Sequence, residues 1–258
     1  YSLGVKLMHL FGSLLVSTIA GLSTVLGGFI IFFKFKEQNI DKFITFALSF
    51  SLAIMIGISV TDLIPESTYV LLSNYGIEKG IVTILLSFII GVLLIHFIHK
   101  KIEARELKNN NLYKLGILNM LALILHNFPE GIATFMSSYK DIHLGIKLSF
   151  AIALHNIPEG ISIAVPIYYA TRSKKNALLK TFLSGIAEPI GAILAYIFLS
   201  KYITNSLISI ILIFVGGIMI TLAIEVILPK AKEYCLNLYL RLGLFIGFLL
   251  VMINYLLF

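Results

Sequence analysis

Long apolar blocks, separated by short polar segments, form the dominant pattern along this chain. A helix needs about 20 mostly apolar residues to cross the hydrocarbon layer of a membrane, and eight blocks are long enough. The expected helices run at about 5–33, 43–72, 81–99, 112–137, 142–170, 177–199, 206–228 and 236–255. The pattern therefore predicts an all-α integral membrane protein with eight transmembrane helices in a single domain, 1–258.

Composition agrees with a membrane protein. Of the 258 residues, 59% are hydrophobic and 13% are charged, against roughly 25% charged residues in soluble domains. The net charge of +7 comes from lysines between apolar blocks, so it indicates orientation and not a nucleic-acid partner. The single cysteine, Cys235, excludes an intramolecular disulfide framework. The first apolar stretch is too long for a cleaved signal peptide, and we expect a few residues to precede Tyr1.

Lysine and arginine are distributed unevenly between the segments that join the helices. When alternate segments are assigned to one side, starting after the first helix, that side holds 15 of the 20 basic residues. The other side holds Lys6, Lys79, Lys140, Lys147 and Lys201. The lysine-rich side is expected to be cytoplasmic, which places both termini outside the cell. We therefore expect a multi-pass protein of the cytoplasmic (inner) cell membrane, with the lipid bilayer as its surroundings.

One polar motif interrupts the apolar pattern twice: LHNFPEG at 125–131 and LHNIPEG at 154–160, 29 residues apart. Each copy begins about 13 residues into its helix, which is near 20 Å at about 1.5 Å per residue. The two helices run in opposite directions, so both copies reach the middle of the membrane. Such a pattern is typical of an inverted repeat with a binding site at the midplane.

Within each copy, the histidine, asparagine and glutamate share one helix face because they lie at positions i, i+1 and i+4. These residues are His126, Asn127, Glu130, His155, Asn156 and Glu159. Pro129 and Pro158 each remove an intrahelical hydrogen bond, so we expect the helices to be loosened there. Gly131 and Gly160 are expected to let a neighbouring helix approach closely.

Two glutamates in the middle of a membrane need a compensating charge, because a charged side chain there costs at least about 2.5–3.5 kcal/mol. No lysine or arginine falls at that depth in the expected helices, which leaves protons or a bound cation. Two imidazoles and two carboxylates fit a tetrahedral Zn²⁺ shell, and the amides suit a harder or more loosely held ion beside it. Glu188, in AEPIG, adds a carboxylate from a third helix. Polar contacts between helices would explain the histidines and asparagines, but not the glutamates.

Further acidic residues lie toward the helix ends. Asp62 and Glu66 are expected near the outer end of the second helix, and Glu225 near the inner end of the seventh. With the midplane cluster they trace a cation path across the membrane, although water near the helix ends would also account for them. Met55, seven residues before Asp62, is a candidate soft ligand or a packing residue.

At these residues the sequence resembles the ZIP (Zrt/Irt-like) family of divalent metal transporters, and in particular its bacterial ZupT-like members. The resemblance rests on ILHNFPEGIATF, IALHNIPEG, IAGLSTVLGG, ISVTDLIPE and ILPKAKE. It implies a 3+2+3 arrangement, in which helices one to three and six to eight are related by inversion around helices four and five. It also implies Zn²⁺ import into the cytoplasm by a homodimer with an elevator-like movement, and no cofactor besides the transported metal.

The resemblance further implies a binuclear site. The first ion would take His126, Glu130, His155 and Glu159. The second would take Asn127, Asn156 and Glu188, with Glu130 and Glu159 bridging the two. HNIPE stands where strongly zinc-selective relatives have HEIPHE, which favours a broader selectivity that includes Fe²⁺, Mn²⁺, Co²⁺ and Cd²⁺.

Two other functions would use the same residues. An intramembrane metal-dependent hydrolase needs an open metal position and an asymmetric general base, whereas the two copies here are equivalent. A path for protons or monovalent cations needs only the carboxylates, and the histidines argue against it. We therefore predict a transporter and not an enzyme.

Overall fold

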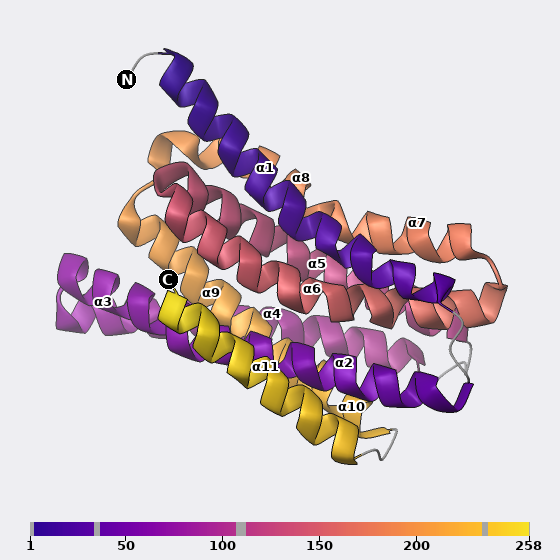
Figure 1. Cartoon of the computed structure of the whole chain (residues 1–258). Helices are drawn as coiled ribbons and strands as arrows, with labels where there is room; N and C mark the ends of the chain where they lie inside the picture. The colour runs from indigo at the N-terminus through magenta and orange to yellow at the C-terminus, as the bar shows by residue number, and fades with distance from the viewer. Residues whose placement is uncertain (1–2, 34–36, 107–111, 234–236, 258) are drawn as a thin grey trace.

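The structure is a computed structural model that describes residues 3–33, 37–106, 112–233 and 237–257. Within these residues every regular element is helical, and the long helices form one bundle (Figure 1). The α-helices are α1 Leu3–Gly28, α2 Glu37–Ile58, α3 Ile64–Tyr75, α4 Ile77–Glu106, α5 Leu112–Lys140, α6 Ile142–Thr171, α7 Lys174–Gly185, α8 Ala187–Leu199, α9 Asn205–Leu222, α10 Leu228–Glu233 and α11 Asn237–Leu257. Short 3₁₀ segments (η1 Phe29–Phe32, η3 Ser200–Tyr202) and π segments (η2 Ser59–Leu63, η4 Ala223–Ile227) extend or join them. The all-α prediction is confirmed.

Seven stretches among the described residues are long and apolar enough to cross a membrane. The long helix outside this group is α5, which carries the first copy of the motif. With 29 residues it is long enough to span, but its histidine, asparagine, proline and glutamate lower its hydropathy. It packs against α6 and α8, two of the seven apolar stretches, and also against α1.

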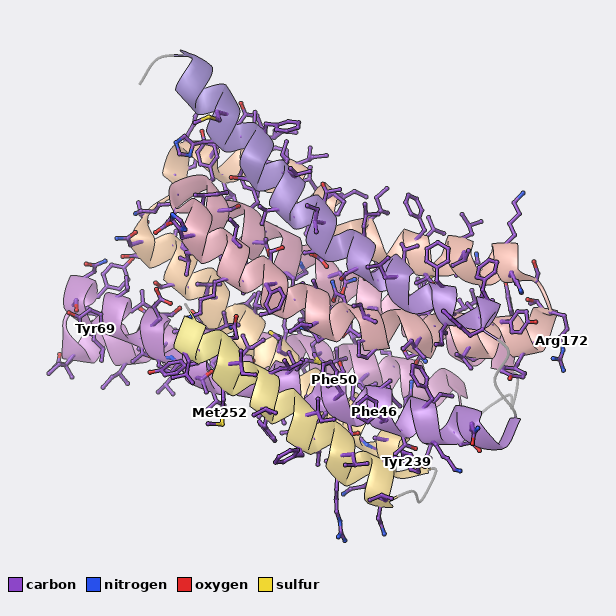
Figure 2. All side chains as sticks on the ribbon, viewed as in Figure 1. Phe46, Phe50, Tyr69, Arg172, Tyr239 and Met252 are labelled. Atoms are coloured by element: carbon purple, nitrogen blue, oxygen red, sulfur yellow. The ribbon has the colours of Figure 1, made fainter. Side chains whose placement is uncertain are left out.

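Apolar side chains cover the outside of the bundle. The apolar windows of α4 and α11 are only 17% and 22% buried, against 67% in α6 and in the stretch that includes α9. Met252 on α11 is 61% exposed and points away from the bundle (Figure 2), as do many leucines, isoleucines and phenylalanines elsewhere. Apolar surfaces of this extent, on helices long enough to span, are typical of a bundle that lies in hydrocarbon. The protein is a multi-pass membrane protein.

Glycines set the closest helix contacts. Where α1 crosses α6, a Cβ at Gly27 of α1 would overlap the main-chain oxygen of Ile157 on α6. In the other direction, a Cβ at Gly160 of α6 would overlap the main-chain oxygen of Thr24 on α1. Between α5 and α8, Gly131 faces the main-chain oxygen of Glu188 in the same manner. The prediction that Gly131 and Gly160 admit a neighbouring helix is therefore confirmed, and these two crossings hold the motif helices against α1 and α8.

Distortions occur elsewhere than expected. α5 and α6 remain continuous α-helices through Pro129 and Pro158. The π segments lie elsewhere: η2 joins α2 to α3, and η4 joins α9 to α10. Each ends just before a proline, Pro65 or Pro229. An extra residue in the turn makes room for a proline ring that would otherwise clash with the carbonyl four residues back.

The expected sixth helix, at 177–199, lies within the candidate membrane span Lys174–Tyr202, but it is not one continuous helix. It is two helices, because α7 ends at Gly185 and α8 begins at Ala187. Pro189 lies in the first turn of α8, where a missing N–H costs nothing. This break places Glu188 at the start of a helix, next to the motif helices.

Candidate metal centre

The two motif copies meet in the core of the bundle, where α5 packs against α6. His126, Asn127 and Glu130 on α5 are fully buried, and so are His155 and Asn156 on α6. Glu159 is 2% exposed, and Glu188 on α8 is fully buried beside them. The i, i+1, i+4 spacing on two continuous helices turns the same three residue types toward one another. All seven residues that the sequence assigned to a metal centre are therefore buried where α5, α6 and α8 meet.

Histidine nitrogens and carboxylate oxygens lie at ligand spacing. Nε2 of His126 is 3.3 Å from Oε1 of Glu130 and 3.6 Å from Oε1 of Glu159. Nε2 of His155 is 3.4 Å from the same Glu130 oxygen. Tetrahedral Zn²⁺, with bonds of about 2.0–2.1 Å, places its ligand atoms roughly 3.3 Å apart. One ligand atom each from His126, His155 and Glu159 also falls within 4.8 Å of the others.

The two asparagines are held by their amide nitrogens. Asn127 Nδ2 donates to the main-chain oxygen of Ser184 at 3.3 Å. Asn156 Nδ2 donates to the main-chain oxygen of Ala20 at 3.0 Å and to Oε1 of Glu188 at 2.5 Å. Both Oδ1 atoms remain buried without a hydrogen-bond partner. Two amide oxygens are thus fixed in orientation and free to bind a cation.

The carboxylates are also without hydrogen-bond partners. Both oxygens of Glu130 and Glu159, and Oε2 of Glu188, are buried in this way. In the part of the chain that the structure describes, the ion-pair partners of Glu130 and Glu159 are the two motif histidines and no lysine or arginine. Buried carboxylates are stable only when they are protonated, paired or bound to a metal. The donor set of nitrogen, carboxylate and amide atoms fits a divalent cation.

A cavity lies between this centre and α10. Glu159 lines it together with Ser51, Ser162, Asn119 and Lys230. Asn119 and Lys230 also line a neighbouring pocket, with His99, and the two are hydrogen-bonded to each other. The centre is therefore approached from the end of the bundle where α10 lies (Figure 1).

Comparison with known proteins decides the family. The family profile described as ZIP Zinc transporter matches residues 99–254. The zinc transporter ZupT of Streptococcus mutans is 38% identical over 262 residues, which cover 97% of this chain and 98% of that protein. The zinc transporter ZupT of Oceanobacillus iheyensis is 42% identical over 237 residues (85% and 88%), and that of Clostridium perfringens 35% over 283 residues (99% and 99%). The chain belongs to the ZIP family. Within that family it is a bacterial ZupT-like member.

Outside the candidate metal centre of this ZIP protein, the candidate pathway residues lie apart. Asp62, in η2, is 8% exposed and forms an ion pair with Lys147 on α6, with 2.7 Å between Oδ1 and Nζ. Glu66, one turn further along, lines a pocket together with Asp62 and Lys147. In η4, the carboxylate of Glu225 lies 3.0 and 3.2 Å from Nδ1 of His96. These pairings could not be found from helical spacing, since each joins helices distant in the chain.

Met55 belongs to the apolar core of the ZIP fold. Its side chain is fully buried, and its sulfur lies 3.8 Å from the hydroxyl of Ser51. Ser51 in turn donates to the main-chain oxygen of His155 at 3.5 Å. Met55 thus packs beside α6, and its role as a ligand stays a prediction.

Proposed function

We propose that this ZIP protein carries divalent cations, with Zn²⁺ as the main substrate, into the cytoplasm. The observation that carries the proposal is the buried centre, in which carboxylate and imidazole atoms without hydrogen-bond partners lie 3.3–3.6 Å apart. That spacing matches the edges of a tetrahedral zinc shell. Relatives named as zinc transporters at 35–42% identity support the same substrate. Fe²⁺, Mn²⁺ and Co²⁺ are proposed as further substrates because Asn156 contributes a harder amide oxygen, and Cd²⁺ is proposed because of its chemical similarity to Zn²⁺.

Two ions are proposed to bind side by side. His126, Glu130, His155 and Glu159 would hold the first ion, and Asn127, Asn156 and Glu188 the second, with Glu130 and Glu159 shared. The unpartnered amide oxygens and the unpartnered Oε2 of Glu188 support the second position. The oxygen and nitrogen atoms of these seven residues would replace the water shell of the cation. The ion would therefore keep polar ligands while it crosses the apolar core. The ions are cargo, and we propose neither a resident cofactor nor an enzymatic reaction.

Eight spans in a 3+2+3 inverted repeat are proposed, with α5 as the fourth span. Several equivalent positions in the two outer triplets, which all differ by 164 residues, support the repeat. Thr24 and Glu188 face the motif glycines, Gly27 and Gly191 face motif main-chain oxygens, and Pro65 and Pro229 follow the π segments. An α5 surrounded by α1, α6, α7 and α8 needs little apolar surface of its own, which fits its lower hydropathy.

Import follows from the proposed orientation. The first turn of α1 and the last turn of α11 lie toward the same end of the bundle (Figure 1), which agrees with an even number of spans. The helix ends at the opposite end carry described members of the basic set, such as Lys101, Arg172 and Lys174, which the positive-inside rule places in the cytoplasm. The cavity that Glu159 lines is also lined by Lys230 of α10, on the side of that end, as expected for a state that releases metal inward. We propose the cytoplasmic membrane as the location and a homodimer whose motif helices move against the rest.

Transport by the purified protein tests this function. Liposomes that contain a metal-sensitive dye would receive Zn²⁺, Fe²⁺, Mn²⁺ or Cd²⁺ from outside. We expect wild type to fill the vesicles and Glu130→Ala/Glu159→Ala not to do so. Glu78→Gln/Glu233→Gln, which changes two exposed glutamates, is the control and should transport like wild type. Vesicles that stay empty of metal, with a folded and metal-binding protein inside their membranes, would contradict transport. Uptake of K⁺ or protons alone would favour the monovalent path.

A further inference from the structure

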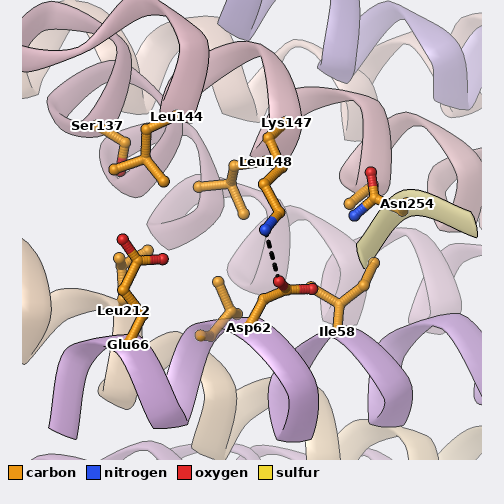
Figure 3. A pocket seen from close by; sticks show the side chains of 11 residues that line it. Ile58, Asp62, Glu66, Ser137, Leu144, Lys147, Leu148, Leu212 and Asn254 are labelled. Carbon is orange, nitrogen blue, oxygen red and sulfur yellow. Dashed lines mark ion pairs between the residues drawn. The ribbon is translucent and has the colours of Figure 1, made fainter. Parts of the chain in front are cut away.

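A second polar pocket lies near the junction of α5 and α6, at the opposite end of the bundle from α10. Its polar lining residues come from five helical segments: Asp62 from η2, Glu66 from α3, Ser137 from α5, Lys147 from α6 and Asn254 from α11 (Figure 3). Four leucines, one isoleucine and one alanine surround them. The pocket thus joins the two motif helices to segments that carry no residue of the metal centre.

The ion pair in this pocket is close and partly shielded from water. Nζ of Lys147 lies 2.7 Å from Oδ1 of Asp62, with side chains that are 18% and 9% exposed. Figure 3 shows the ammonium group reaching across the pocket to the carboxylate. Lys147 precedes His155 by eight residues on the same helix, which is about 12 Å along the axis. It therefore puts a positive charge above the metal centre, on the path from the proposed outer side.

More polar atoms line the pocket than the ion pair satisfies. Asn254 is 3% exposed, and neither its amide oxygen nor its amide nitrogen has a hydrogen-bond partner. Ser137 is fully buried, and its hydroxyl is also without a partner. Buried polar groups are normally paired, so an unpaired set indicates a ligand. Amide, hydroxyl and two carboxylate groups provide the oxygen atoms that divalent cations bind.

We propose that this pocket is an outer binding site for the transported divalent cation, in which the Lys147 ammonium is a tethered cation that the metal displaces. The proposal rests on the transport function above. Asp62, Glu66, Asn254 and Ser137 would bind the metal through oxygen atoms. An ammonium and a divalent ion repel each other, so they exclude one another from the same carboxylate. Arrival of metal outside would therefore break the contact between α6, which carries the second motif, and η2.

Transport kinetics of Lys147 variants test the displacement. Lys147→Met removes the competing charge, and we expect a roughly fivefold lower KM for external Zn²⁺ with little change in kcat. Lys147→Arg keeps the charge and should keep the KM of wild type, whereas Asp62→Asn should raise it roughly tenfold. Lys140→Met, an exposed lysine on the same side, is the matched control. If Lys147→Met alters kcat and thermal stability while KM stays unchanged, the ion pair is only structural and the proposal is wrong.

A second measurement uses the wild-type protein, with one double variant of the metal centre as a comparison. A water-soluble acylating reagent would label lysines in detergent solution, with increasing Zn²⁺, and mass spectrometry would quantify each site. We expect labelling of Lys147 to rise with Zn²⁺, labelling of Lys140 to stay constant, and the same rise in Glu130→Gln/Glu159→Gln. If transport fails but Lys147 still responds, the outer site stands without the proposed function. If the protein transports metal, but Lys147→Met leaves KM unchanged and Zn²⁺ leaves the labelling of Lys147 unchanged, the outer site is refuted and the proposed function stands.

Discussion

The two copies of the motif stand in nearly the same backbone surroundings but not beside the same side chains. Asn127 donates to the main-chain oxygen of Ser184, and Asn156 donates to that of Ala20. Four residues after those acceptors come Glu188 and Thr24, whose main-chain oxygens press on Gly131 and Gly160. The backbone contact is therefore present twice, whereas the carboxylate is present once. Thr24 is fully buried, and its hydroxyl has no hydrogen-bond partner.

This difference shows how packing and charge are separated in the centre. Helix contacts at glycine can be repeated at little cost, because they bury only small groups. A fourth carboxylate in place of Thr24 would add repulsion against Glu130 and Glu159, because two like charges about 4 Å apart repel by about 4 kcal/mol at an effective dielectric of about 20. The charges of three carboxylates can be balanced by one or two divalent ions. When the ions leave, three negative charges must be neutralised, and not the four that a carboxylate at position 24 would give.

The largest contrast between the copies should come from their glutamates. Glu130 Oε1 lies near both imidazoles, at 3.3 and 3.4 Å, whereas Glu159 Oε1 lies 3.6 Å from one of them. Glu130→Gln should therefore weaken Zn²⁺ binding on the order of 100-fold or more, and Glu159→Gln by less. Titration calorimetry in detergent would measure both, with Glu78→Gln as the control. Equal losses would show that these contacts do not rank the two ligands.

The next largest effect is expected at Glu188 and Thr24, the two equivalent positions that differ in side-chain chemistry. Glu188→Gln should lower the rate of Zn²⁺ transport roughly tenfold, because the second position loses its own carboxylate. Thr24→Val keeps the shape and removes a neutral hydroxyl, so we expect a loss of less than about threefold. Thr181→Val is the control, since the Thr181 hydroxyl is buried but bonded within its own helix to Ala177. A Thr24→Val loss as large as that of Glu188→Gln would mean that the two halves contribute alike.

Much of the centre could be predicted from the sequence, because it depends on spacing within single helices. Positions i, i+1 and i+4 put His126, Asn127 and Glu130 on one face wherever the helix packs, and the doubled motif indicated a common depth. The break before Glu188 was missed, since a continuous apolar run conceals that a new helix, α8, begins at Ala187. Lys147 was counted only as a charge, and Asn254 was not considered. Their roles depend on contacts between helices, which spacing along one helix does not determine.

A smaller effect is expected from the two motif glycines. Alanine at Gly131 or Gly160 would push a Cβ into a main-chain oxygen, and such overpacking costs roughly 1–3 kcal/mol. Both variants should unfold at lower temperature by similar amounts. Gly131→Ala should also slow transport more, since it displaces Glu188, whereas Gly160→Ala displaces Thr24. Gly12→Ala is the control, because a Cβ there would meet only the Ile142 side chain at 3.7 Å. Thermal unfolding and vesicle uptake, measured on the same preparations, would reveal any departure from this order.

The smallest expected effect is a change in the free energy of unfolding when the carboxylate in either π segment, η2 or η4, is neutralised. Asp62 in η2 is 8% exposed and paired with Lys147 at 2.7 Å, whereas the Glu225 and His96 side chains of the second pair are 32% and 46% exposed. Asp62→Asn should lower the free energy of unfolding by about 1 kcal/mol or more, because it leaves a partly buried ammonium without its partner. Glu225→Gln should change it by less than about 0.5 kcal/mol, since water screens exposed ion pairs. Added salt should reduce the second effect further and leave most of the first. Thermal unfolding at low and high ionic strength measures both, and equal salt sensitivity would show that the η2 pair is as open to water as the η4 pair.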